Sequence, residues 1–261
     1  MISHAPRGVP PARPGCEARR EADDRMMHPE LLHPARIPAR ARLTVPPAAV
    51  ERAREGRASP LPADWITEGG LRAFRADAGY LGRSIAALKL YLALVVSQDA
   101  AGGDPAPILL SYERIAALSG LSDPLICADK KALLDQGLVA TCGDRPGGTI
   151  AYRLTGLHPS TAVSLLHGPR PGMPIATLHG LTCRKAPNLA ALKTYLLLCA
   201  YGCDLDGAVT LDVDAAAGLT LTSHVKIVAA LAALQSLGLA EALGTPTRLA
   251  DQRRIRLLPL R

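Results

Sequence analysis

Side chains that could support catalysis or metal binding are few and scattered in this chain of 261 residues. Four carboxylates lie close together in the sequence at Asp204, Asp206, Asp212 and Asp214, but the glycine, asparagine and glutamate positions of a calcium-binding loop are missing. The six cysteines include no Cys-x-x-Cys pair and no close group with histidines, so no zinc site is expected. A Walker-type loop, a Gly-x-Ser-x-Gly elbow and a His-x-x-x-His pair are also missing. We therefore expect a protein that is not an enzyme and uses no cofactor or metal.

Hydropathy predicts a cytoplasmic protein with no membrane partner. The apolar segment 85–96 is too short to cross a bilayer, and segment 225–243 is interrupted by Lys226, Gln235 and Glu241. The first residues contain no apolar stretch of the kind found in secretory signals.

The net charge of +7 is unevenly distributed along the chain. Residues 1–62 carry +4 and residues 158–185 carry +3, whereas residues 63–157 carry −1 and residues 186–261 carry +1. The basic composition alone is therefore weak support for a nucleic-acid partner. The position of the few cations within each domain is more informative.

Two segments, 86–154 and 190–258, follow the same pattern. The letters AALKLYLAL at 86–94 return as AALKTYLLL at 190–198, and Tyr91 and Tyr195 are expected in equivalent core positions. A repeat of about 100 residues indicates duplicated domains, because solenoid units recur every 20–50 residues.

Apolar periodicity, capping residues and glycines predict the elements of each copy. The first copy should contain a helix capped by Ser84, a strand at 108–110, a helix capped by Ser111, a turn at 119–121, a helix from Ser122 to Gly137, and a hairpin of 138–142 with 149–154. The second should contain a helix at 189–201, a strand at 209–211, a helix over 213–217 capped by Asp212, a turn at 218–221, a helix from Thr222 to Gly238, and a hairpin of 239–243 with 253–258. The spacing from the second cap to the glycine is one residue longer in the second copy.

These elements suggest four regions. Residues 1–62 form a disordered arm rich in arginine and proline, and residues 63–157 form a first domain with an extra N-terminal helix around Trp65. Residues 158–185 form a flexible linker rich in proline and glycine, and residues 186–261 form the second domain.

The letters IAALSGLS at 115–122, followed by an apolar helix and by QGLV at 136–139, resemble the winged helix-turn-helix superfamily. The similarity is to bacterial transcription regulators and to phage or plasmid replication proteins, and with the second copy it covers about 170 residues. It implies a mainly α structure with small β-wings (α+β), that is, two winged-helix domains in tandem.

The resemblance also implies that the helix after each turn lies in a major groove of DNA, while cations of the wing contact phosphates. The candidates in the first copy are Ser122, Asp123, Lys130, Lys131, Arg145 and Arg153. Those in the second copy are Thr222, Ser223, His224, Lys226, Arg248, Arg253, Arg254 and Arg256.

By this chemistry the second copy is the better reader of DNA, because its helix begins with hydroxyl, imidazole and ammonium groups and no carboxylate. Asp123 could accept a hydrogen bond from a cytosine amine or repel the backbone, so the first copy is also a candidate dimerisation or partner surface. Lys130 and Lys131 could simply form a solvated helix face, and His224 could be a surface residue near a cap. Arg253 and Arg254 are neighbours in a strand and must point to opposite faces.

Three functions follow. The favoured one is sequence-specific binding of double-stranded DNA by a bacterial transcription regulator, as a monomer or a homodimer that contacts the transcription machinery. The second is initiation of replication of a plasmid or mobile element, in contact with the replication machinery. The third is a winged-helix scaffold that binds protein, which the nearly neutral domains leave open.

Overall fold

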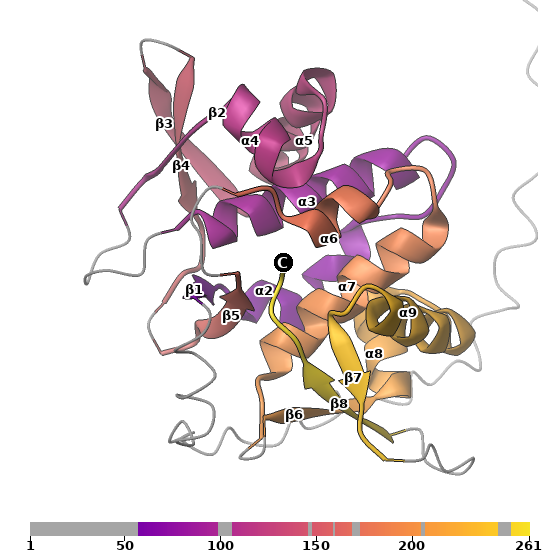
Figure 1. Cartoon of the computed structure of the whole chain (residues 1–261). Coiled ribbons are helices and arrows are strands. Elements are labelled where there is room, and N and C mark those ends of the chain that lie inside the picture. Colours follow the sequence, from indigo (N-terminus) through magenta and orange to yellow (C-terminus); the bar gives the residue numbers. More distant parts are fainter. Residues whose placement is uncertain are drawn as a thin grey trace, which may run out of the picture. The chain divides into compact units, whose positions relative to one another are not determined.

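The structure is a computed structural model in which residues 57–98, 106–145, 148–158, 160–168, 173–204, 207–244 and 252–261 are described, without the side chains of 143–145. All of them belong to one compact unit, residues 42–261. The arm expected at 1–62 lies outside the described residues as far as residue 56, and so does Arg248. The expected mixture of helices with small sheets is confirmed (Figure 1).

The first copy places three helices beside a three-stranded antiparallel sheet. Its elements are α3 (Leu81–Val96), β2 (Ile108–Ser111), α4 (Tyr112–Ser119), α5 (Asp123–Asp135), β3 (Val139–Arg145) and β4 (Thr149–Leu154). The last strand lies in the middle of the sheet, which has the order β2-β4-β3.

The second copy repeats this order of helices and strands. Its elements are α7 (Ala186–Tyr201), β6 (Ala208–Asp212), α8 (Val213–Thr220), α9 (His224–Ser236), β7 (Ala240–Ala242) and β8 (Gln252–Leu257). The sheet order β6-β8-β7 matches that of the first copy, again with the last strand in the middle.

Capping residues fix the start of the first short helix in each copy. The Ser111 hydroxyl accepts a hydrogen bond from the backbone N–H of Arg114 at 3.2 Å, and the Asp212 carboxylate accepts one from Ala215 at 2.9 Å. Each satisfies an N–H group that the helix itself leaves unpaired. Both predicted caps are confirmed.

Other predicted boundaries are wrong by a few residues. α3 begins at Leu81, and the predicted cap Ser84 lies inside it and donates to the carbonyl of Arg75 at 2.9 Å. α8 continues through Gly218 to Thr220, and α9 is capped at Ser223 instead of Thr222. With this correction the spacing from cap to glycine is equal in the two copies, Ser122 to Gly137 and Ser223 to Gly238.

The segment before α3 forms two short helices instead of the single helix expected there. These are α2 (Asp64–Thr67) and the 3-10 helix η1 (Gly70–Ala73). The helical conformation is interrupted between them at Gly69, whose φ is +88°. Trp65 donates from its indole nitrogen to the Tyr91 hydroxyl at 2.9 Å. The Arg72 side chain donates to the carbonyl of Gly218 at 2.9 Å, so this segment contacts both copies.

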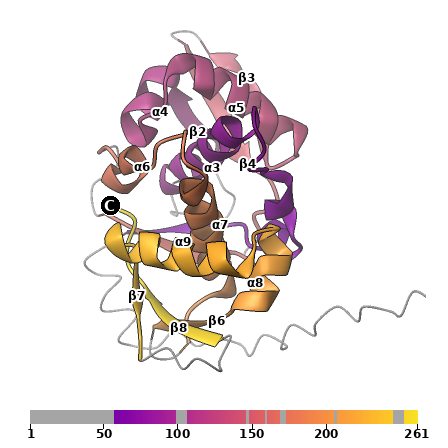
Figure 2. The same ribbon diagram turned by 90° about the vertical axis from the view of Figure 1, so that its right-hand side faces the viewer.

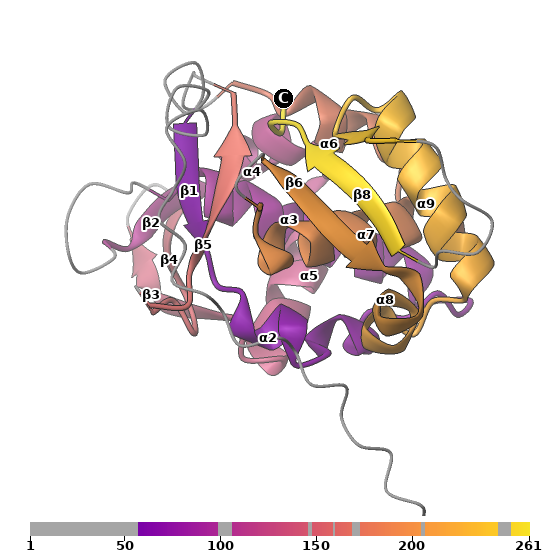
Figure 3. The ribbon, with the colours of Figure 1, turned by 90° about the horizontal axis from the view of Figure 1, so that it is seen from below.

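The expected arm and linker pair with each other where they are described. β1 (Arg57–Leu61) and β5 (Val163–His167) form a two-stranded antiparallel sheet, visible in Figure 3. α6 (Ala176–Gly180) follows, and its Leu178 is fully buried. The prediction of a flexible linker at 158–185 is therefore wrong for its described residues, because Leu165 and Leu178 bury their side chains in the core.

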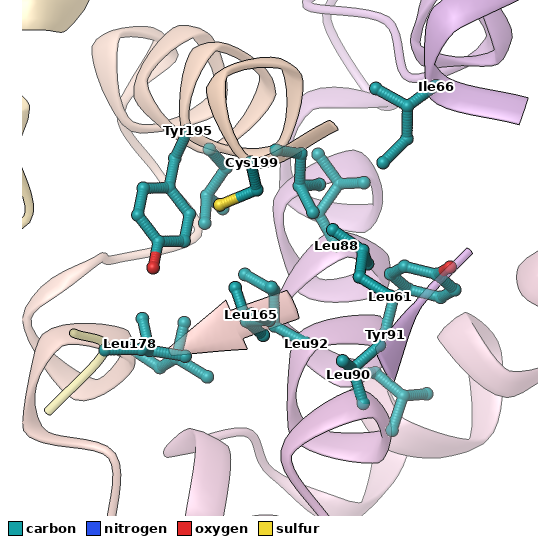
Figure 4. Close-up of a cluster of buried hydrophobic side chains, with 14 of the residues drawn as sticks. Leu61, Ile66, Leu88, Leu90, Tyr91, Leu92, Leu165, Leu178, Tyr195 and Cys199 are labelled. Carbon is teal, nitrogen blue, oxygen red and sulfur yellow. The ribbon is translucent and has the colours of Figure 1, made fainter. Parts of the chain in front are cut away.

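The two copies share one hydrophobic core. α3 packs against α7, and Figure 4 shows Leu88 and Tyr91 of α3 in the same cluster as Tyr195 and Cys199 of α7. Leu165 of β5 lies in this cluster too (Figure 4). The core positions predicted for the two tyrosines are confirmed. The copies are thus packed together and are not separate bodies on a pliable connector.

Within the described ranges, no single helix is both long enough and apolar enough to cross a membrane. Taken together, α8 and α9 meet that test of length and composition, but they are bent by 99° at the turn between them.

Candidate nucleic-acid interface

One face of α5 is buried against α3. Ile126, Asp129 and Leu133 are spaced so that they share this face, and each is at most 1% exposed. The N-terminal residues and the opposite face, which includes Asp123, Cys127 and Lys131, remain exposed. The helix is therefore anchored on one side and open on the other.

The two lysines predicted on α5 are engaged within their own copy. Lys131 lies 3.5 Å from the Asp135 carboxylate, one helical turn away. The Lys130 ammonium lies over the Tyr112 ring at 5.4 Å from its centroid. Contact with a phosphate would have to replace or share these interactions.

The remaining first-copy candidates lie at the start of α5 and on β3 and β4. Ser122 occupies the N-cap position of α5 and is exposed, although its hydroxyl makes no capping hydrogen bond within the described residues. Arg153 is exposed on β4, opposite Ala140 of β3. Arg145 ends β3, and its side chain lies outside the described residues.

α9 is anchored in the same way as α5 but presents a different surface. Ile227, Ala230 and Leu234 are buried against α7, with the same spacing as in α5. On the outer side, Val225 is 77% exposed and Val228 is 37% exposed. Lys226 is exposed between them in the sequence.

The turn before α9 holds a residue in an unusual conformation. Leu221 has a φ of +48° and is 71% exposed, and it stands where the first copy has Gly120 at a φ of +68°. The Thr222 hydroxyl donates back to the carbonyl of Thr220 at 3.3 Å. Ser223 is exposed at the N-cap.

His224 and the arginines of the hairpin complete the second-copy candidates. His224 contacts Asp214 of α8, with 3.2 Å between its Nδ1 and the carboxylate. Arg253 is half-buried on the same side of β8 as the buried Ile255, whereas Arg254 is exposed on the other side. The predicted opposite orientation of the two arginines is confirmed.

A groove of about 310 Å³ lies between α9 and the β7–β8 hairpin, elements that Figure 2 shows adjoining each other. Its α9 side is formed by Val228, Leu231, Ala232 and Gln235. Its hairpin side is formed by Ala240, Ala242, Leu243, Gly244, Gln252, Arg253, Arg254 and Ile255. The groove thus has apolar walls and two arginines among its lining residues.

Two buried lysines, which we did not predict, support the helices around these surfaces. Lys193 of α7 donates to the carbonyl of Thr220 at 2.8 Å and so holds the end of α8. Burial lowers the pKa of Lys193 to about 8. Lys89 occupies the equivalent position in α3 and donates to the carbonyl of Leu181 at 3.1 Å, and burial lowers its pKa as well. A lysine at the same place in both apolar repeats was the signal for these roles.

Asp129 is a second feature that the sequence analysis missed. It is fully buried, and neither carboxylate oxygen has a hydrogen-bond partner among the described residues. Burial raises its pKa to about 7, against a smaller opposing effect of Arg83. Its spacing from Ile126 and Leu133 indicated a buried position, although an aspartate on a helix is normally exposed.

No three histidine, cysteine or acidic side chains gather as a metal site in the described part of the chain. Comparisons with protein-family models, with curated proteins and with solved structures found no match.

Proposed function

We propose that this chain binds double-stranded DNA through α5 and α9, as two winged helices in tandem. The support is the order helix, strand, helix, helix, strand, strand, which occurs twice with the same order of strands in the sheet. In the winged-helix arrangement, the second helix of the turn enters a major groove and the hairpin contacts the flanking backbone.

The observation that carries this proposal is the shared attachment of α5 and α9. Each helix buries three residues at the same spacing and leaves its N-terminal end and outer face exposed. A reading helix needs this combination, because it must be held rigidly while its side chains reach base edges.

Charge supports an anionic partner on the second copy. Lys226 is exposed on α9, and Arg254 is exposed on β8. Two carboxylates of this copy have basic partners of their own, since Asp214 contacts His224 and Glu241 pairs with Arg256 at 3.1 Å. Cations beside a helix that carries no acidic residue would favour contact with phosphates.

Regulation of transcription is the cellular role that we propose first, and initiation of replication at a plasmid or mobile element is the second. The two differ in the DNA that the chain would protect. A regulator protects an operator near a promoter, whereas an initiator protects repeated sites near an origin. Footprinting on the DNA that surrounds the chain's own coding sequence distinguishes them.

The salt dependence of duplex binding tests the proposal. The logarithm of the affinity for a random 30-base-pair duplex should fall linearly with the logarithm of salt concentration, with a slope of about −0.9 for each phosphate contacted. Lys226→Ala should reduce this slope by about one contact. Lys185→Ala is the matched control, because it removes an exposed lysine that lies outside α5, α9 and both hairpins.

The apolar face of α9 favours one other candidate function, a scaffold that binds protein. A scaffold would retain no duplex at about 0.15 M salt, and it would yield a stable complex with a protein partner. An unchanged slope in Lys226→Ala would remove the second copy from the DNA interface.

A further inference from the structure

The exposed surface at the start of α9 is unusually apolar. Six large apolar side chains are exposed among the described residues, and three of them, Leu221, Val225 and Val228, fall within eight consecutive positions. Val225 and Val228 are three residues apart on α9, a spacing that brings side chains to one side of a helix, and Leu221 lies in the turn before it. The patch occupies the turn and the first part of the helix, where a reading helix contacts base edges.

The backbone conformation of Leu221 is energetically unfavourable for a leucine. A φ of +48° places its Cβ close to the following carbonyl, a conformation that a glycine adopts without strain, as Gly120 does at the equivalent turn. Because Leu221 is 71% exposed, its side chain gains little from the core in return. Such a residue is better explained by a surface that needs it than by folding.

The charges around the patch fit a polyanion. No acidic residue occurs from 221 to 236, whereas Lys226 lies between the two exposed valines in the sequence. A protein interface of ordinary stability needs about 800 Å² on each partner, and three side chains on one turn and helix provide much less. An apolar patch on a helix that carries one exposed lysine and no carboxylate therefore fits the major groove of a duplex better than it fits a protein surface.

Only one group in the major groove is apolar. Thymine presents its C5-methyl group there, whereas the other edges present hydrogen-bond donors and acceptors. Valine and leucine cannot pair with donors or acceptors, but they can contact methyl groups. We propose that α9 reads thymine methyl groups, so that the second copy selects sites rich in thymine, an inference that rests on the proposed binding of double-stranded DNA.

The first copy should lack this preference. Because Ser122 and Ser223 both occupy the N-cap position of their helices, Val225 and Val228 correspond to Pro124 and Cys127. The exposed face of α5 also bears Asp123 and Lys131, which are charged. Selection of thymine methyls is thus expected only in the part of the site that contacts α9.

The test compares two forms of one duplex. The full chain first enriches a 30-base-pair duplex from a random library, and that duplex is then made with thymine or with deoxyuridine, which lacks the methyl group. Each contacted methyl should contribute about a fourfold difference in affinity, so two or more contacts should weaken binding by more than tenfold. Equal affinity for the two duplexes, with a normal salt slope, would overturn the inference and leave the proposed function intact.

Variants assign the effect to α9. The double variant Val225→Thr/Val228→Thr keeps the shape of both exposed side chains, and it should bind the thymine duplex as weakly as the deoxyuridine duplex. Cys127→Ser on α5 is the matched control and should leave the preference unchanged. If the double variant keeps wild-type DNA affinity but changes the oligomeric state in sedimentation, the patch is a protein interface and the inference is wrong. If the wild-type chain binds no duplex at all, the proposed function fails and the inference fails with it.

Discussion

α5 and α9 are the same helix with two different surfaces. Both have 13 residues, and both follow a serine at the N-cap. Each helix ends two residues before a glycine, which is Gly137 after α5 and Gly238 after α9. Ile126 corresponds to Ile227 and Leu133 to Leu234, and all four are buried. The difference on the inner face is Asp129, which corresponds to Ala230.

On the outer side the two helices differ more. α5 exposes Asp123 and a Lys131–Asp135 ion pair, whereas α9 exposes two valines and one lysine. The comparison shows that the two helices keep the same two large buried residues, while the exposed surface changes from charged to apolar. It also shows that this packing does not require the carboxylate of Asp129, since α9 has Ala230 at the same position.

Placing the aspartate of α5 into α9 should have the largest effect. Ala230 is 1% exposed, so Ala230→Asp puts a carboxylate into a site built for a methyl group. We expect a loss of about 5 kcal/mol in the free energy of unfolding at pH 8, from desolvation of the charge and from overpacking. Urea denaturation measures the loss.

Ala229→Asp is the control, because Ala229 is the exposed neighbour on the same helix, and it should change stability by less than about 0.5 kcal/mol. A loss below about 1 kcal/mol for Ala230→Asp would mean that water reaches this side of α9.

The effect of the buried Asp129 carboxylate of α5 on stability should depend on pH, and Asp129→Asn should remove this dependence. Because the pKa of Asp129 is about 7 in the folded chain and lower in the unfolded chain, the folded state binds more protons between about pH 4 and 7, and stability falls as pH rises through this window. Asparagine removes this term, so the variant should gain up to about 4 kcal/mol over the wild type at pH 8. Urea denaturation at several pH values gives the difference.

The two proteins should have similar stability near pH 4, where Asp129 is neutral in both states, and this is the internal control. Subtracting the wild-type free energy of unfolding from that of the variant at each pH also cancels the contribution of His167. Burial lowers the pKa of His167, so its effect on stability has the opposite sign. A difference that does not vary with pH would show that the carboxylate is solvated.

The two turns should respond in opposite directions to substitution. Gly120→Ala should cost about 1–2 kcal/mol, because φ is +68° and a Cβ there would lie 3.0 Å from the His179 ring. Leu221→Gly should raise stability by about 0.5–1 kcal/mol, because it relieves a similar strain at an exposed site. Thermal unfolding of both variants tests the pair, and a destabilised Leu221→Gly would mean that Leu221 contributes to packing.

The smallest expected difference concerns the surface lysines. Lys226→Ala should reduce the salt slope of DNA binding by about 0.9, whereas Lys131→Ala should reduce it less, because Lys131 already has Asp135 at 3.5 Å. Neither substitution should change stability by more than about 0.5 kcal/mol. Equal changes in slope would indicate that both helices contact phosphates to the same extent.

Local signals accounted for the parts of the fold that were predicted correctly. Ser111 and Asp212 cap helices through contacts within three residues, so sequence alone reveals them. The apolar periodicity of α3 and α7 is local in the same sense, and it identified both repeats together with their core tyrosines.

The errors arose where distant residues decide the structure. β1 and β5 pair across more than 100 residues, and neither segment alternates clearly enough to reveal this. α8 was predicted to end before Gly218, but the helix continues to Thr220 and is followed by Leu221, whose left-handed conformation is rare for a leucine.

The candidate surface was only partly predictable, for a similar reason. The exposed position of Lys226 follows from helical spacing, whereas the contacts of Lys130 with Tyr112 and of Lys131 with Asp135 depend on the folded chain. Val225 and Val228 are visible as apolar residues in the sequence, but only the fold shows that they lie on the exposed side of α9.

The strand β5 has a mechanical consequence for the whole molecule. It pairs with β1 along its length, and the backbone N–H of Leu260 donates to Leu166 at 2.9 Å while Gly168 donates to Leu260 at 2.8 Å. The segment between the two copies is thereby hydrogen-bonded to β1, which precedes the first copy, and to Leu260, which follows the last strand of the second. This pairing would hold α5 and α9 at a fixed distance from each other. A DNA duplex that contacts both helices must therefore present its two contact sites at a matching helical spacing.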